Sequence, residues 1–385
     1  MGTCQSATRA VGILLFIAAV ALADAPAPAP PAKPAEPVND PLCVGWNNSW
    51  VVYRFVPAQG QWLLWNSPPS PLPAQAMSVV GPHSVAVIEP RRQCGGWLFD
   101  LHTQKWISIP VSPFAGPPAG TTAISLALVD RQLIVWGHTN GGADGSILDP
   151  KTMQWRRMAA SPVSVRFRAA TAVIGDQLLV WGGYGHNDPN NPRRFGPLAD
   201  GAVYDVTQDK WEKMPDTPVA MPTYGYVWTR WNDRLVIFGG RTGQVVCRTG
   251  VIYDPGAKSW EIINDCPFEL GHQSACAVHK DRLLVWSGAS PSAAVAGRTI
   301  YSRDCGMYDF GTKKWEKVPG APMEPRLLAF ARTQGDQIII WGGWISGNRQ
   351  GEFLTDAATY DAVNGVWQKL PDLPGKVPYA LHPGW

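Results

Sequence analysis

Arginine and aromatic residues lie in the longer stretches between the apolar segments of this chain, where they are placed to bind a ligand. Guanidinium groups form bidentate hydrogen bonds with carboxylates, and aromatic rings stack on sugars and cations. Arg166 and Arg326 hold equivalent places, each sixteen residues before a glycine pair. The sequence predicts a ligand-binding rim of Arg166, Arg326, Tyr184, His186, Arg241, Arg298, Trp344 and Arg349. The alternative is that these residues are solvated loop charges and framework positions.

Motifs for catalysis or metal binding are not found in a matching context. No CxxC pair suggests zinc, and no P-loop, GxSxG or dinucleotide motif sits where its chemistry would need it. We therefore assign no catalytic residue, and we predict no metal and no cofactor. The seven histidines are scattered, and a net charge of +3 gives no footprint for nucleic acid.

A repeated spacing dominates the chain and must position these side chains. An aspartate followed six residues later by a tryptophan recurs at a period of roughly 50 residues, which indicates a repeat architecture. The side chain of such an aspartate can bind the backbone of a turn, and the tryptophan offers a large plate for packing between units. We interpret all of these pairs as framework: Asp100 with Trp106, Asp149 with Trp155, Asp205 with Trp211, Asp254 with Trp260, Asp309 with Trp315, and Asp361 with Trp367.

Each unit also contains an apolar strand that ends in small residues. Three units have an intact glycine pair, which permits positive φ or close backbone approach. These pairs are Gly182 with Gly183, Gly239 with Gly240, and Gly342 with Gly343. Turn-forming residues separate each aspartate from its tryptophan, which predicts a hairpin. Four antiparallel strands per unit describe one blade of a propeller. One face then has short turns, and the long connections after the glycine pairs lie on the other, where function is more often placed.

These residues resemble the Kelch-repeat family, whose signature is a diglycine, then a Tyr-Asp pair, then a tryptophan six residues after the aspartate. The resemblance implies an all-β propeller formed by residues 41–385 as a single domain. We predict seven blades, with six as the alternative. In the seven-blade arrangement, Trp62 marks a weaker first unit, and the C-terminal tail after Trp367 supplies its missing strand and closes the ring.

The resemblance implies binding as the main role, since most members act as scaffolds for a protein or a glycan. The alternative is a carbohydrate-active enzyme such as a sialic-acid epimerase or mutarotase. Its acid and base would come from Glu324 or Glu352 with His186 or His272. A copper oxidase resembling galactose oxidase is disfavoured, because its adjacent Tyr-His pair is reduced here to Tyr184-Gly185-His186.

The N-terminus has the pattern of an exported protein. Residues 1–23 read as a signal peptide and residues 24–40 as a Pro/Ala-rich disordered linker, which predicts a secreted or periplasmic protein without a stable membrane span after cleavage. Six cysteines would then remain, an even number that permits disulfides. The hairpin between Asp254 and Trp260 places Cys247 and Cys266 nearly opposite each other, so we predict a bond between them.

Overall fold

The computed structural model describes residues 42–46, 50–56, 59–72, 76–90, 93–114, 124–137, 145–186, 195–222, 224–243, 245–290, 300–346 and 351–374. They belong to one compact unit, Pro37–Trp385, and the extended elements that they form are the β-strands β1 to β36. The predicted signal peptide (1–23) and linker (24–40) lie outside the described residues. None of the described segments forms a helix long and apolar enough to cross a bilayer.

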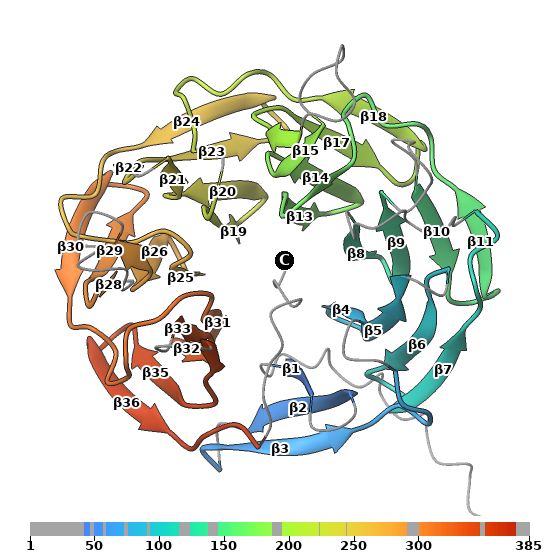
Figure 1. The fold of residues 1–385 in the computed structure, drawn as a ribbon, viewed down its shortest axis with the longest axis horizontal. Helices are drawn as coiled ribbons and strands as arrows, with labels where there is room; N and C mark the ends of the chain where they lie inside the picture. The colour runs from blue at the N-terminus through green and yellow to red at the C-terminus, as the bar shows by residue number, and fades with distance from the viewer. Residues whose placement is uncertain are drawn as a thin grey trace, which may run out of the picture. The chain divides into compact units, whose positions relative to one another are not determined.

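Six four-stranded antiparallel sheets confirm the predicted all-β fold with four strands per unit. In each sheet the strands run from the centre of the ring outwards in chain order (Figure 1). The first three sheets contain β4 (Met77–Val80), β5 (Ser84–Glu89), β6 (Gly95–Asp100) and β7 (Lys105–Ile109); β8 (Ser125–Val129), β9 (Gln132–Trp136), β10 (Gly145–Asp149) and β11 (Gln154–Arg157); and β13 (Ala170–Ile174), β14 (Gln177–Trp181), β17 (Gly201–Asp205) and β18 (Lys210–Lys213).

The next three sheets have the same order of strands. They contain β19 (Val227–Trp231), β20 (Arg234–Phe238), β23 (Gly250–Asp254) and β24 (Ser259–Ile263); β25 (Ala275–His279), β26 (Arg282–Trp286), β29 (Cys305–Asp309) and β30 (Lys314–Val318); and β31 (Phe330–Gln334), β32 (Gln337–Trp341), β35 (Ala357–Asp361) and β36 (Val366–Leu370). A further sheet near the N-terminus has three strands among the described residues: β1 (Leu42–Trp46), β2 (Trp50–Val56) and β3 (Gln61–Asn66).

The number of blades stays a prediction. The tail expected to complete the three-stranded sheet, 375–385, lies outside the described residues. Packing nevertheless joins the last four-stranded sheet to the three-stranded sheet near the N-terminus. Ile339 and Trp341 of the former share a buried cluster with Val52 and Tyr53 of the latter. The rings of Trp62 and Trp341 lie 5.4 Å apart, as those of Trp211 and Trp136 do at 5.7 Å. The contact of Trp62 in the three-stranded sheet with Trp341 in the last four-stranded sheet thus resembles the contact of Trp211 with Trp136 between two successive sheets.

The repeated aspartates hold the turns that end each third strand. The Asp254 Oδ1 atom accepts the backbone N–H of Ala257 at 2.9 Å, and Asp309 Oδ1 accepts that of Thr312 at 2.7 Å. Turn hydrogen bonds of this kind lower the pKa of both carboxyl groups. An ionised aspartate therefore stabilises the hairpin that leads to the tryptophan.

The repeated tryptophans join each sheet to the one before it. The Trp260 indole N–H donates to the carbonyl oxygen of Pro215 at 2.9 Å, four residues beyond the tryptophan of the preceding unit. The indole rings also pack edge-on between sheets, with Trp181 and Trp260 6.1 Å apart. A neutral hydrogen bond contributes about 1 kcal/mol, so packing and bonding together make each tryptophan a link between units. Equivalent N–H bonds are donated by Trp155, Trp211, Trp315 and Trp367.

Trp106, the first tryptophan of the predicted series, is placed in the framework by its packing. It lies on β7, where it is half-buried and its ring is 4.9 Å from that of Phe99 in the same sheet. It also packs against the buried cluster that contains Val52 and Phe55 of the three-stranded sheet. The Trp106 side chain therefore contributes to the boundary between the first four-stranded sheet and its N-terminal neighbour.

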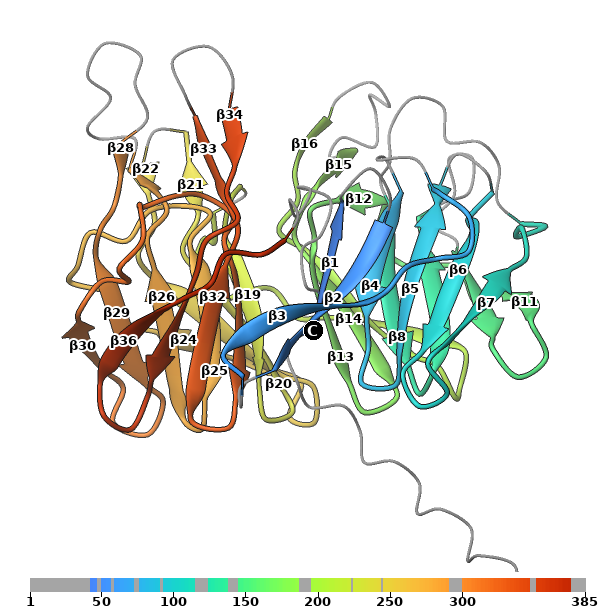
Figure 2. The ribbon, with the colours of Figure 1, turned by 90° about the horizontal axis from the view of Figure 1, so that it is seen from below.

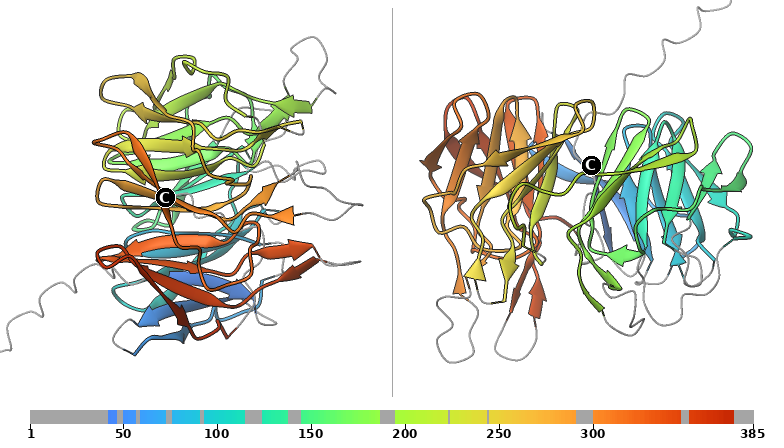
Figure 3. Two further views of the ribbon diagram at one scale, coloured as in Figure 1. Left: turned by 90° about the vertical axis from the view of Figure 1, so that its left-hand side faces the viewer. Right: turned by 90° about the horizontal axis from the view of Figure 1, so that it is seen from above.

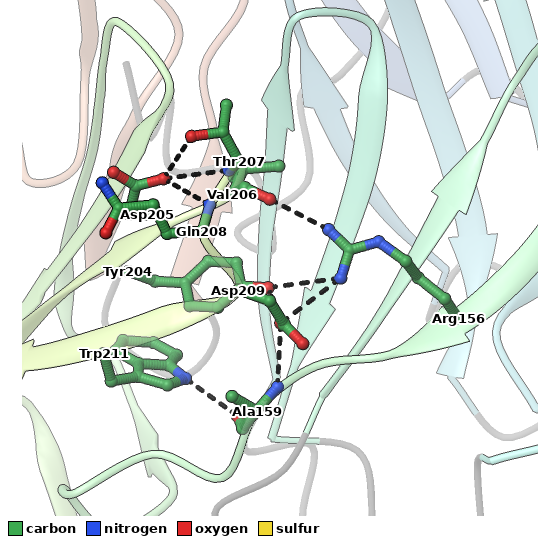
Figure 4. A network of polar contacts seen from close by, with 9 residues as sticks. All are labelled: Arg156, Ala159, Tyr204, Asp205, Val206, Thr207, Gln208, Asp209 and Trp211. Carbon is green, nitrogen blue, oxygen red and sulfur yellow. Dashed lines mark hydrogen bonds and ion pairs between the residues drawn. The ribbon is translucent and has the colours of Figure 1, made fainter.

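Charged side chains cross one of these boundaries, between β11 and the β17–β18 hairpin (Figure 4). Arg156 on β11 donates to Asp209 at 3.3 Å and to the carbonyl oxygen of Val206 at 3.1 Å. Tyr204 donates to the same Asp209 carboxylate, and burial together with this bond raises the pKa of the Tyr204 hydroxyl to about 12. At the next boundary the charges are reversed, because the acid, Glu212, lies on the preceding sheet and pairs at 2.6 Å with Lys258 of the following one. The boundary after that repeats this polarity, since Lys313 pairs with Glu261 at 2.6 Å.

Short hairpins project from one face of the ring, beyond the glycine pairs (Figure 2). The tight turns lie on the opposite face, and two further views show the same separation (Figure 3). We term the first of these the hairpin face. Its strands are β12 (Arg166–Phe167), β15 (Tyr184–His186), β16 (Phe195–Pro197), β21 (Arg241–Thr242), β22 (Val245–Val246), β27 (Ala289–Ser290), β28 (Ile300–Tyr301), β33 (Trp344–Ser346) and β34 (Gly351–Phe353).

The second glycine of a pair lies where the chain enters the hairpin face. Gly183 has φ +88°, and a Cβ there would lie 2.7 Å from the Phe167 carbonyl oxygen. Gly343 has φ +99°, and a Cβ there would lie 2.8 Å from the Leu327 carbonyl oxygen. Both the positive φ and the close backbone approach therefore require glycine at these two positions.

The predicted disulfide between Cys247 and Cys266 is not formed, and both residues are free thiols. The pairing of β23 with β24 ends at Gly250 and Ile263, before it reaches the cysteines. Cys247 instead closes the β21–β22 hairpin, where its N–H donates to the Gly240 carbonyl oxygen at 2.8 Å. Cys266 is buried, and burial raises the pKa of its thiol to about 11. The prediction extended the hairpin register past the end of the ladder, where the Cys266 N–H donates to the Arg248 carbonyl oxygen at 2.8 Å in a shifted register.

Candidate functional site

Arg166 and Arg326 are not on a rim, which corrects the prediction that they bind ligand. Their exposed fractions are 0% and 1%. The Arg326 guanidinium donates to the carbonyl oxygens of Glu324 at 2.6 Å and Gly342 at 3.1 Å, and it forms a two-pronged ion pair with Asp356. Because these bonds tie the start of a unit to its glycine pair, the arginine belongs to the framework.

Arg166 has the same role with a less complete set of partners. It donates to the carbonyl oxygens of Ser164 at 2.8 Å, Gly182 at 3.1 Å and Asp200 at 3.0 Å, and its Nη1 atom contacts one carboxylate oxygen of Asp200 at 2.8 Å. Its Nη2 atom is buried without a hydrogen-bond partner. Arg166 and Arg326 each lie sixteen residues before a glycine pair because both arginines bind the backbone of that pair, and not because they share a ligand.

The other predicted ligand-binding residues lie on separate hairpins. Tyr184 is half-buried on β15, with its ring 5.4 Å from that of Phe167, and His186 ends the same strand with an exposed side chain. Trp344 is half-buried on β33, where its indole lies against Gly351. Arg298 and Arg349 lie outside the described residues. Of the predicted set, the structure places Arg241 in a polar cluster.

That cluster surrounds the ring of Tyr224, at the inner edge of the hairpin face. The guanidinium carbons of Arg168 and Arg241 lie 5.4 Å and 5.1 Å from the ring centroid, which is the distance of a cation–π contact. The Tyr224 hydroxyl oxygen accepts hydrogen bonds from Arg168 at 3.0 Å and from Gln273 at 3.4 Å. The ring of His272 lies 6.0 Å from that of Tyr224. We call Arg168, Tyr224, Arg241, His272 and Gln273 the Tyr224 cluster.

The backbone under the Tyr224 cluster is fixed by bonds between neighbouring sheets. Arg168 and Gln273 adopt the left-handed conformation, with φ of 57° and 56°, as does Gly225 with φ of 69°. The Gln273 N–H donates to the Gly225 carbonyl oxygen at 2.6 Å, and the Tyr226 hydroxyl donates to the Arg168 carbonyl oxygen at 3.0 Å. Residues from three successive sheets are thus held together before any ligand binds.

His272 is a buried member of the cluster with an unusual ionisation. Burial, assisted by the charge of Arg241, lowers the pKa of His272 to about 4. The imidazole is therefore neutral at pH 7, with one nitrogen as donor and the other as acceptor. Its Nδ1 atom is buried and has no hydrogen-bond partner among the residues that the structure describes, and a Cβ on Gly225 would lie 3.0 Å from it.

The acid and base considered for an enzyme are not paired by these contacts. Glu324 is exposed and pairs with Arg303 at 3.5 Å, and Glu352 is exposed on β34. His272 instead lies beside Tyr224 and Gly225. In the part of the chain that the structure describes, no group of three or more His, Cys, Asp and Glu residues is placed to hold a metal ion.

Sequence reasoning missed Arg168, Tyr224 and Gln273, and it considered His272 only as a possible base. An available signal was their position, because each precedes the innermost strand of its unit. The corresponding residues of the last unit, Leu327 and Leu328, are apolar. A comparison of units at this position would have found the polar sector.

Known proteins share this architecture. A model of the KLHDC2/KLHL20/DRC7 Kelch-repeats domain matches residues 75–266. Kelch domain-containing protein 3 of Rattus norvegicus is 25% identical over 224 residues, which cover 51% of this chain and 54% of that protein. Kelch-like protein 15 of Mus musculus is 28% identical over 289 residues, covering 68% of this chain and 45% of that protein. The chain thus spans about half the length of these curated relatives.

Two further similarities extend over more of the chain. The N-(sulfonatooxy)prop-2-enimidothioate sulfolyase of Thlaspi arvense is 22% identical over 359 residues, covering 80% of this chain and 98% of that protein. The solved structure of YjhT has a TM-score of 0.51 and 19% identity, covering 69% of this chain and 88% of that chain. At this identity the structural similarity shows the fold alone.

Proposed function

This chain belongs to the Kelch-repeat family, and we propose that it is a protein-binding propeller whose hairpin face holds the partner. Kelch domains generally bind protein partners. The export predicted from residues 1–23 would place this binding in the periplasm or outside the cell. Glycan binding is the alternative occupant of the same face.

The composition of the hairpin face carries the proposal. Val245 on β22 and Ile300 on β28 have exposed fractions of 72% and 38%, and they lie on hairpins of neighbouring sheets. Exposed apolar side chains near arginine and tyrosine are typical of the central part of a protein interface. Sugars instead need stacked aromatic plates and many hydroxyl partners, which these two aliphatic residues do not provide.

A cross-link between two hairpins also supports a preformed binding face. The Tyr301 hydroxyl lies 3.0 Å from the Ser346 hydroxyl, and it accepts the Ser346 N–H at 2.7 Å. This contact joins β28 to β33 across two sheets. Binding then requires less ordering of the hairpins, which lowers the entropic cost of association.

The test is capture of binding partners on the immobilised full chain, with two matched double variants. Val245→Glu with Ile300→Glu should abolish capture of proteins that the wild type retains. Val363→Glu with Val366→Glu is the control, since these exposed apolar residues lie at the β35–β36 hairpin away from the hairpin face. Equal capture by the wild type and the first variant would disprove the proposal, and unchanged circular dichroism would show that both variants fold.

An enzyme is the second candidate, because the alignment with the Thlaspi arvense sulfolyase covers 98% of that protein. The direct test is sulfate release from N-(sulfonatooxy)prop-2-enimidothioate by the purified chain. Release above the rate without protein, lost on heat denaturation, would favour catalysis over binding alone.

A further inference from the structure

The Tyr224 cluster contains a cation, Arg241, that forms no ion pair with any residue the structure describes. Among the described residues, Arg241 has no carboxylate partner, and its guanidinium contacts the Tyr224 ring and, at 3.5 Å, the Gly243 carbonyl oxygen. The side chain is half-buried, so part of its hydration is lost. Buried charges are normally paired, and an anion from outside the chain would complete this one.

The hydroxyl group of Tyr224 is arranged to donate to such an anion. Its oxygen accepts from Arg168 and Gln273, and those bonds do not use its own proton. Arg168 and Arg241 both lie against the ring, so the hydroxyl is held in a positive field. A carboxylate beside Arg241 would therefore accept from a guanidinium and from a phenol.

His272 gives a second, independent indication of a ligand. Its side chain is 7% exposed, and no described residue forms a hydrogen bond with its Nδ1 atom. Most buried polar atoms in proteins have a partner, and an unpaired one commonly marks a water or ligand position. In the tautomer with the proton on Nδ1, the imidazole is a further donor beside Tyr224.

Resting on the proposed function, we infer that the Tyr224 cluster binds the side-chain carboxylate of an aspartate or glutamate in the partner protein. Arg241 supplies the charge, Tyr224 donates from its hydroxyl, and Arg168 and Gln273 position the ring. The exposed Val245 and Ile300 lie on hairpins of the same face and favour a protein over a sugar as the source of the carboxylate. The partner would then place one acidic side chain at Arg241 and apolar side chains against Val245 and Ile300.

The probe is an array of short peptides, acetylated and amidated so that side chains are the only acids. Each Asp- or Glu-containing peptide is paired with its Asn or Gln counterpart. The wild-type chain should bind the acidic member about tenfold or more tightly, as a charge-assisted hydrogen bond predicts. Arg241→Gln should remove this preference, and Arg241→Lys should retain part of it because the charge remains.

A matched control is Arg303→Gln, which removes an exposed arginine from the hairpin face where it pairs with Glu324. It should leave the acid preference unchanged. An equal preference in Arg241→Gln, or none in the wild type, would overturn the inference. Arg241-dependent binding of sialyllactose over lactose, without peptide binding, would also overturn it by replacing the protein with a glycan.

The two proposals fail in different ways. If Val245→Glu with Ile300→Glu abolishes protein capture but Arg241→Gln leaves both capture and acid preference intact, the carboxylate site is wrong and the hairpin face stands. If the apolar double variant captures partners as the wild type does, the proposed function itself is wrong.

Discussion

Removal of the Arg326 side chain should destabilise the fold more than removal of any exposed arginine. Arg326→Met keeps an unbranched apolar chain in the site but deletes the bonds to the carbonyl oxygens of Glu324 and Gly342 and the ion pair with Asp356. Breaking a buried pair from one side costs about 3–5 kcal/mol, because the remaining charge loses its partner. Asp356 retains 23% exposure, so we expect a loss near the lower end, about 3 kcal/mol.

The assay is urea unfolding followed by tryptophan fluorescence and by far-ultraviolet circular dichroism. Coincident transitions would justify a two-state free energy of unfolding. Arg303→Met is the control, because Arg303 and Glu324 have exposed fractions of 76% and 73%, and an exposed pair contributes under about 1 kcal/mol. The double variant Arg326→Met with Asp356→Leu should recover much of the loss, since an apolar pair can replace a buried ion pair.

A comparison with the second buried arginine makes the prediction sharper. Arg166 contacts one carboxylate oxygen of Asp200 and leaves its Nη2 atom without a partner, whereas Arg326 contacts both carboxylate oxygens of Asp356. Both guanidinium groups make four hydrogen bonds, but Arg166 reaches the Asp200 carbonyl oxygen where Arg326 reaches a second carboxylate oxygen, so Arg166→Met should cost less than Arg326→Met by about 1 kcal/mol. If Arg326→Met unfolded at the wild-type urea concentration, or if Arg303→Met were equally damaging, the framework role would be refuted.

Two further predictions concern the repeated residues. Trp260→Phe keeps an aromatic ring but removes the N–H bond to Pro215, so urea unfolding should show a loss of about 1–2 kcal/mol; an unchanged midpoint would contradict the link between sheets. Folding lowers the pKa of four turn aspartates, so their contribution is complete above their unfolded pKa of about 3.9 and is lost as the pH falls through the folded pKa. The urea midpoint should decrease below about pH 4, less so in Asp254→Asn, and a pH-independent midpoint would count against the turn bonds of Asp205, Asp254, Asp309 and Asp361.

The framework could be predicted because its chemistry is local. Asp254 binds a turn three residues away, and Trp260 follows on the paired strand, so a single short window contains the hairpin. Because this Asp-to-Trp segment recurs along the chain, the sequence also predicted several similar sheets that pack against one another. The Cys247–Cys266 prediction used the same local register and failed beyond the ladder, because sequence spacing does not show where the register of two paired strands changes.

Burial of a charged side chain was beyond the reach of the sequence. Arg166 and Arg326 looked like a binding pair because arginine is usually exposed and the two share a repeat position. Their partners, Asp200 and Asp356, follow 34 and 30 residues later. Only the fold shows that each aspartate returns to the glycine pair beside its arginine.

The contrast between equivalent positions separates framework from binding residues. Tyr224, His272 and Leu327 each form the same bridge to the residue that follows the last glycine after the second strand, so the backbone needs no particular side chain there. The side chains at these equivalent positions nevertheless differ: Tyr224 and His272 are polar and belong to the cluster that contains Arg241, whereas Leu327 is apolar. A residue type that recurs with the same bonds, such as Arg326, supports the fold, whereas a polar group at a position whose backbone role is already fulfilled requires another explanation. Within the described part of the chain, Arg241 has no carboxylate partner and the His272 Nδ1 atom no hydrogen-bond partner, which is why we propose the carboxylate site there and not at the repeated arginines.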